Sequence, residues 1–210
     1  MKIDLRKCTL STAVLVTVYA VYRVVQKCCW WAGIHIWLHH PILGHIVGNG
    51  IEKLFYMCIA IFLLGVWTNR YQLPARTKQW NHMRNILVLS LGYLLIFQIQ
   101  FICSYPMSIS DIFMYTLWII PVVYASAIWM FYRQTKNSEA ETYCLSNMRA
   151  TLLFYAAVLL IIGVVVEIIL CVLWYNDATI WYDRWHTRIP AIITAVSEIL
   201  LVLFLIIKNK

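Results

Sequence analysis

Long apolar runs separated by short polar stretches dominate the pattern of this chain. A helix needs about 20 mostly apolar residues to cross a bilayer core of roughly 30 Å. The runs are continuously apolar and do not alternate in ten-residue units, which favours helices over a β-barrel. The pattern predicts an all-α integral membrane protein, a single domain with six transmembrane helices at about residues 8–26, 51–68, 85–105, 112–132, 150–174 and 190–207.

The composition narrows the class of protein further. Of the 210 residues, 62% are apolar and 12% are charged, whereas soluble domains are roughly half apolar and a quarter charged. A soluble protein of this size lacks the interior to bury so much apolar surface. The seven cysteines contain no C-x-x-C pair, so a thiol-disulfide oxidoreductase is not expected.

The basic residues orient the predicted bundle. If the N-terminus is cytoplasmic, the two termini and every second loop lie inside the cell. These inner segments, together with the helix end that adjoins one of them, carry twelve of the seventeen Lys and Arg residues. Inner loops of membrane proteins are enriched in these residues, so we predict a multi-pass cell-membrane protein with both termini cytoplasmic. The same bias explains the net charge of +8. Nucleic acid is not an expected partner, because no basic stripe with interleaved aromatic residues lies outside the spans.

The predicted number of spans depends on the segment Trp30–Gly48. We interpret it as a Trp/His-rich segment after the first helix that lies at the outer interface or re-enters the membrane, because indole rings prefer the headgroup region. The glycines near its end, Gly44, Gly48 and Gly50, predict a turn into the second span. If the segment crossed the membrane as a seventh span, the cation-rich Arg70–Arg84 loop would face outside.

The sharpest local pattern is His35-x3-His39. Two imidazoles at i and i+4 share one helix face and can bind a metal together. One hypothesis is a small outer metal site that also includes His186 and Asp183. The alternative is that these histidines lie beside tryptophans at the headgroups. No catalytic motif occurs in the chain, and we predict neither catalytic residues nor a cofactor.

Five polar residues interrupt the apolar runs. All of them fall in the predicted outer half of the bundle, and they are the candidate ligand-binding or proton-coupling residues: Arg23, Gln98, Gln100, Glu167 and Glu198. Polar groups at membrane depth are costly and are functional candidates for that reason. Small residues follow the same helix faces as both acids, at Ala156 and Gly163 on one span and at Ala191 and Ala195 on the next. Such stripes are typical of helix contacts, so both acids are expected to point inward.

The spacing allows Arg23, Glu167 and Glu198 to form one cluster, in which two acids face one cation. The excess negative charge would then hold a proton or attract a cationic group. The alternative is that the polar residues only hold helices together.

The first functional hypothesis is a non-enzymatic polytopic membrane subunit. It would bind a ligand or partner helix in an outward-facing polar pocket, within a larger sensing, transport or defence assembly. Its expected partners are the lipid bilayer and either another protein or further copies of itself. The second is a small proton-coupled secondary transporter that uses Glu167 or Glu198. The third is a membrane enzyme with an outer histidine metal site.

Overall fold

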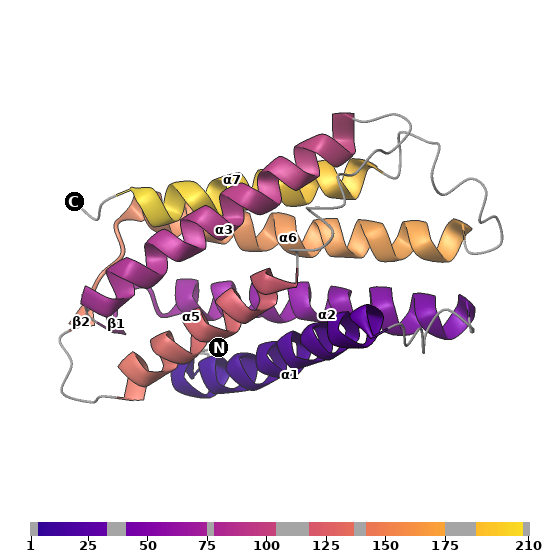
Figure 1. The fold of residues 1–210 in the computed structure, drawn as a ribbon. Coiled ribbons are helices and arrows are strands. Elements are labelled where there is room, and N and C mark those ends of the chain that lie inside the picture. The colour runs from indigo at the N-terminus through magenta and orange to yellow at the C-terminus, as the bar shows by residue number, and fades with distance from the viewer. Residues whose placement is uncertain are drawn as a thin grey trace.

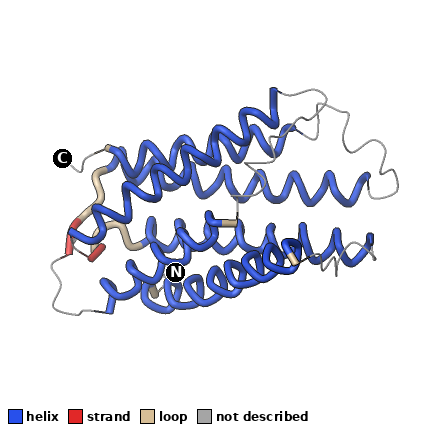
Figure 2. The backbone as a smooth tube through the Cα atoms, viewed as in Figure 1, coloured by secondary structure: helices blue, strands red, loops and turns tan. Residues whose placement is uncertain are grey.

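The computed structural model describes residues 4–32, 41–74, 78–103, 118–136, 142–174 and 188–207. This part of the chain is helical except for short connections and one pair of two-residue strands (Figure 2). The helices are α1 Leu5–Trp31, α2 Pro41–Thr68, α3 Lys78–Cys103, α5 Ile119–Lys136, α6 Asn147–Trp174 and α7 Ile189–Ile206. The strands are β1 Leu73–Pro74 and β2 Thr142–Tyr143. The predicted helical class is confirmed.

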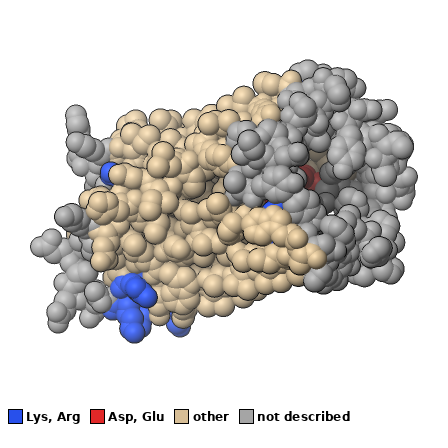
Figure 3. Space-filling view, viewed as in Figure 1, with Lys and Arg blue, Asp and Glu red and all other residues tan. Residues whose placement is uncertain are grey.

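Five of these helices are long and apolar enough to cross a membrane, namely α1, α2, α3, α6 and α7. Helix α5 begins at Ile119, so residues 112–117 of the predicted fourth span lie outside the described residues. Among the described residues in Figure 3, uncharged side chains cover the middle of the visible face, and basic side chains are visible near one end. Many large apolar side chains of the described helices are highly exposed, with Leu89 at 74%.

Helix α2 begins ten residues before the predicted second span, at Pro41. The predicted turn at Gly44–Gly50 is wrong, because these residues are helical. Proline suits a first helical position, since its missing N–H has no partner there in any helix. Each glycine in a helix costs about 1 kcal/mol relative to alanine. In an apolar environment the helix forms nevertheless, because the backbone must satisfy its hydrogen bonds internally.

The two described ends of the segment Trp30–Gly48 belong to different helices. Trp30 and Trp31 end α1, and residues 41–48 open α2. Residues 33–40, including the histidine pair, lie outside the described residues, and the predicted position of this stretch at the outer interface stays a prediction. The alternative of a seventh span over this segment also stays a prediction.

The six described helices form a closed ring in the order α1–α2–α6–α7–α3–α5, and α5 contacts α1 again. Neighbours in the ring run in opposite directions (Figure 1). The closing contact between α5 and α1 includes a hydrogen bond in which Trp129 Nε1 donates to Thr17 Oγ1 at 2.8 Å. Between α1 and α2, the rings of Tyr19 and Phe55 stack with centroids 4.5 Å apart. This order determines which side chains can meet inside.

The connections α2–α3 and α5–α6 meet at one end of the ring. Strands β1 and β2 pair antiparallel there, with Leu73 opposite Tyr143, and Leu145 N donates to Arg70 O at 2.8 Å. Both chain termini lie toward this same end in Figure 1. We call it the strand end. The two loops that the charge bias predicts on one side of a membrane therefore lie together.

Helices α6 and α7 approach each other through small residues, as the stripes predict. Ser197 is fully buried and its Oγ donates to the backbone oxygen of Ala156 at 2.7 Å. A Cβ added at Gly163 would lie 2.8 Å from Thr194 Cγ2. The contact thus depends on the absence of a side chain at Gly163.

This contact gives a first prediction. Gly163→Ala is expected to destabilise the protein by about 1–3 kcal/mol, because the new methyl group overlaps Thr194 Cγ2 in a closely packed contact. Gly92→Ala is the matched control, since a Cβ there meets nothing within 4 Å. The measurement is thermal unfolding in a mild detergent.

Thr194→Ser should rescue Gly163→Ala, because serine lacks the methyl group and keeps the hydroxyl, which bonds to Pro190 O at 3.0 Å. Equal melting temperatures for Gly163→Ala and Gly92→Ala would contradict the contact.

Candidate functional site

Two of the predicted polar residues meet across the α3–α7 contact. Gln98 Nε2 donates to Glu198 Oε1 at 2.9 Å. Glu198 is 3% exposed, and its other oxygen, Oε2, has no hydrogen-bond partner among the described residues; the same holds for Gln98 Oε1. Two buried acceptors thus lack a donor in the described part of the chain. Unsatisfied buried acceptors are unfavourable, so this pair is suited to receive a donor such as a proton, a water molecule or a cationic group.

The second acid, Glu167 on α6, forms an ion pair with Lys53 on α2. Both side chains are largely buried, at 13% exposed for Lys53 and 30% for Glu167. Arg23 is half-buried on α1, and among the described residues it is within ion-pair distance of neither acid. The expected single cluster is therefore two separate pairs, and the cation that faces Glu167 is Lys53.

Gln100 is half-buried on α3, two residues after Gln98 along the chain. Near it, Arg188 closes the end of the same helix, because its Nη1 donates to the backbone oxygen of Ile102 at 2.8 Å. The last carbonyl groups of a helix have no partner within the helix, so an arginine there satisfies one of them. Arg188 therefore has a structural role that its position in a predicted outer loop does not reveal.

The metal hypothesis falls on residues outside the described part. His35, His39, Asp183 and His186 lie in residues 33–40 and 175–187. Within the described ranges no group of three or more His, Cys, Asp or Glu side chains lies close enough together to hold a metal ion. The outer metal site stays a sequence-based prediction.

A second feature, which the sequence did not predict, is a cavity inside the ring toward the strand end. It has a volume of about 100 Å³ and is lined by residues from α2, α3, α5, α6, α7 and both strands. The walls are apolar and aromatic, and include Phe62, Leu87, Phe131 and Leu201. In the described part of the chain, no Asp or Glu lines the cavity.

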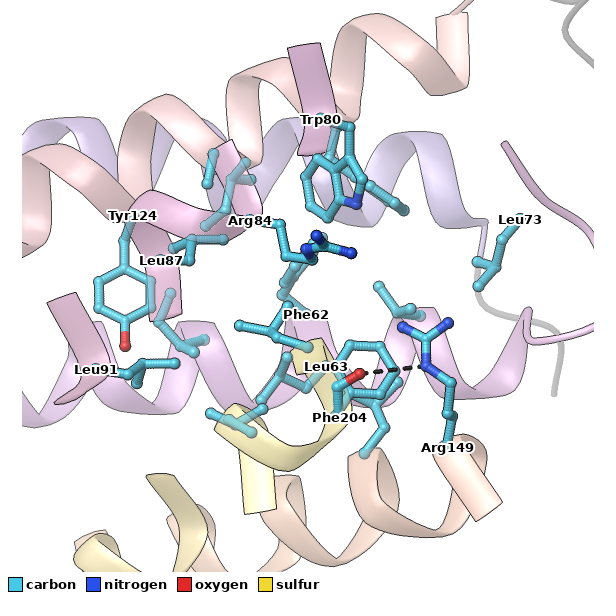
Figure 4. A pocket seen from close by; sticks show the side chains of 18 of the residues that line it. Phe62, Leu63, Leu73, Trp80, Arg84, Leu87, Leu91, Tyr124, Arg149 and Phe204 are labelled. Carbon is cyan, nitrogen blue, oxygen red and sulfur yellow. Dashed lines mark hydrogen bonds between the residues drawn. The ribbon is translucent and has the colours of Figure 1, made fainter. Parts of the chain in front are cut away.

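Two arginines line this cavity. Arg84 comes from the second turn of α3, and its guanidinium lies between Trp80 and Phe62 in the space that Figure 4 shows. Arg149 comes from the first turn of α6 and is 2% exposed. Its Nε donates to the backbone oxygen of Phe204 at 3.2 Å, and its guanidinium lies 4.6 Å from the centre of the Phe204 ring. Arg149 thus satisfies a carbonyl in the last turn of α7 while it faces the cavity.

Sequence reasoning counted Arg84 and Arg149 among the inner-loop cations that orient the bundle. In the sequence each directly precedes a predicted span, whereas the structure places each inside the start of a helix, where the helix dipole disfavours a cation. An arginine inside a helix start is a candidate for an interior role. Which helices surround such an arginine depends on the order of the helices in the ring.

The fold and these sites define a helix ring of membrane-spanning length that encloses an apolar cavity with basic groups. Comparison with known protein families, curated proteins and solved structures finds no match.

Proposed function

We propose that this chain is a non-enzymatic multi-pass membrane protein that binds a ligand inside its helix ring, as a subunit of a larger sensing, transport or defence assembly. The cavity lined by Arg84 and Arg149 carries the proposal. The sequence-based hypothesis was a ligand in an outward-facing polar pocket. The cavity lies toward the strand end instead, and we propose that the ligand binds there.

The chemistry of the lining supports binding over catalysis. Among the described residues that line the cavity, the polar side chains belong to tryptophan, tyrosine and arginine. This described set contains no Ser, Cys, His or carboxylate that would act as a nucleophile or general base. Ligand sites are commonly apolar cavities with a few polar groups that fix orientation. The partners in this proposal are the lipid bilayer, the ligand, and either a second protein or further copies of this chain.

The test compares the protein with a variant whose cavity is filled. Ala127 on α5 lines the cavity and is 5% exposed. Ala127→Leu is expected to keep the fold, since the added atoms occupy existing space. We expect native mass spectrometry to detect a bound small molecule on the wild type purified in mild detergent and none on Ala127→Leu. Ala157 is fully buried outside the cavity lining. Ala157→Leu is the matched control, and we expect it to destabilise the protein by about 1–3 kcal/mol. The same bound molecules on wild type and Ala127→Leu would overturn the proposal.

The orientation in the cell membrane is part of the same proposal, with both termini and the strand end cytoplasmic. Two native cysteines test it, because Cys144 is exposed beside β2 and Cys103 is exposed at the opposite end of the ring. In intact cells a membrane-impermeant maleimide is expected to label a variant that keeps only Cys103 and to spare one that keeps only Cys144. Labelling of Cys144 in sealed cells would reverse the orientation.

A second candidate function is a proton-coupled secondary transporter. The buried acceptor Glu198 Oε2, which lacks a hydrogen-bond donor among the described residues, favours it. In proteoliposomes an imposed proton gradient would then drive uptake by the wild type, and Glu198→Gln would abolish that uptake while the protein stays folded. Uptake that survives this substitution would exclude coupling through Glu198.

A further inference from the structure

The cavity places positive charge where apolar walls surround it. Long basic side chains at a helix end normally extend outward, so that the charged group reaches water or headgroups. Arg84 does the opposite, because its guanidinium turns into the space between Trp80 and Phe62 (Figure 4). Its one hydrogen bond among the described residues is weak, since Nη2 donates to Asn85 Oδ1 at 3.3 Å. Arg84 is half-buried and this bond is exposed, so its guanidinium lines the cavity while it still reaches solvent.

The electrostatics of the cavity favour an anion. Arg84 and Arg149 carry like charges, and the described residues that line the cavity include no carboxylate. Like charges repel more strongly in a low-dielectric interior than in water. Helices α3 and α6 both direct their N-terminal ends to this region, and neither has an acidic residue in its first turn. The helix dipoles therefore add positive potential to that of the two guanidinium groups.

The shape and size restrict the ligand further. A guanidinium is a planar fork that matches the two oxygens of a carboxylate. The bond from Arg149 Nε to Phe204 O and the contact with the Phe204 ring hold that guanidinium in one orientation. The volume of about 100 Å³ is somewhat smaller than the ~150 Å³ apolar cavities that hold a benzene molecule. A body of a few carbon atoms fits such a space.

We infer that the cavity binds a short-chain organic carboxylate, with its anionic group at Arg84 and Arg149 and its apolar body against the walls formed by Leu87, Phe131 and Leu201. The inference rests on the proposed function and names the ligand class of that cavity. A carboxylate is present in free fatty acids, and the phosphodiester in the headgroup of an anionic lipid such as phosphatidylglycerol also pairs with a guanidinium fork. The experiment therefore includes an arm for each source.

The experiment measures binding of hexanoate and of its neutral isostere hexanamide to the full chain in nanodiscs of zwitterionic phosphatidylcholine. Hexanoate is expected to bind at least tenfold more tightly than hexanamide, because charge-assisted bonds to guanidinium are stronger than neutral ones. Arg84→Gln is expected to remove this tenfold difference and to leave hexanamide binding unchanged. Arg133 is exposed in the last turn of α5, at the strand end, and does not line the cavity. Arg133→Gln is therefore the matched control for the lost charge and should behave as wild type.

The outcomes separate the ligand class from the site. Equal affinities for hexanoate and hexanamide that Ala127→Leu abolishes would overturn the anionic class and leave the binding cavity in place. Hexanoate binding that Ala127→Leu does not change would overturn both. If phosphatidylglycerol added to the nanodiscs competes with hexanoate in the wild type and not in Arg84→Gln, the same site takes the anion from a lipid headgroup. If phosphatidylglycerol does not compete, the site takes the free carboxylate.

Discussion

Lys53→Met is expected to destabilise the protein by about 3 kcal/mol. The substitution leaves the carboxylate of Glu167 on α6 without the cation that pairs with it from α2. Removal of one partner of a largely buried ion pair leaves an uncompensated charge, and typically costs about 3–5 kcal/mol. We place the loss at the lower end, because Glu167 keeps 30% of its side chain exposed. The measurement is unfolding of the purified protein in mild detergent.

The double substitution Lys53→Met with Glu167→Met is expected to recover stability to within about 1 kcal/mol of the wild type, since apolar replacement of both partners removes the stranded charge. Lys136→Met is the matched control, because Lys136 is exposed in the last turn of α5. Strictly additive losses from the two single substitutions would mean that the pair contributes no coupling energy.

Glu198→Gln is expected to stabilise the protein by about 1 kcal/mol, whereas Gln98→Leu should destabilise it by about 2 kcal/mol. An amide at Glu198 provides an N–H donor for Gln98 Oε1 and still accepts from Gln98 Nε2, so both buried acceptors without a donor disappear. Leucine at Gln98 removes the donor that Glu198 Oε1 has and leaves both carboxylate oxygens of a 3% exposed side chain without one. Thermal unfolding of both variants at one pH checks the opposite signs.

Ser126→Ala serves as the reference for loss of a polar group on a neighbouring helix. The Ser126 hydroxyl bonds within its own helix to Val122 O at 2.9 Å and is exposed, so its removal should change stability by less than about 0.5 kcal/mol. A loss in Glu198→Gln as large as that in Gln98→Leu would show that the charge of Glu198 itself stabilises the fold.

The sequence alone determined the helical class and the approximate position of the apolar helices. Apolar runs about 20 residues long leave few alternatives, because a backbone in an apolar environment must satisfy its hydrogen bonds within a helix. Local spacing also predicted that Ala156 and Gly163 face a neighbouring helix, and Ser197 and Thr194 of α7 do meet them. The start of α2 was predicted wrongly, because glycines that predict a turn in water are helical here.

Only the tertiary structure decided which polar groups meet. Depth along the helices made Arg23, Glu167 and Glu198 equally plausible neighbours. In the ring, however, α1 lies between α2 and α5, whereas α2 borders α6 and α3 borders α7. Glu167 therefore meets Lys53, and Glu198 meets Gln98. Closure of the ring also encloses Arg84 and Arg149 in one cavity. Hydrophobic pattern and charge specify how each segment lies in a membrane, but the order of helices around a ring depends on packing between segments far apart in the chain.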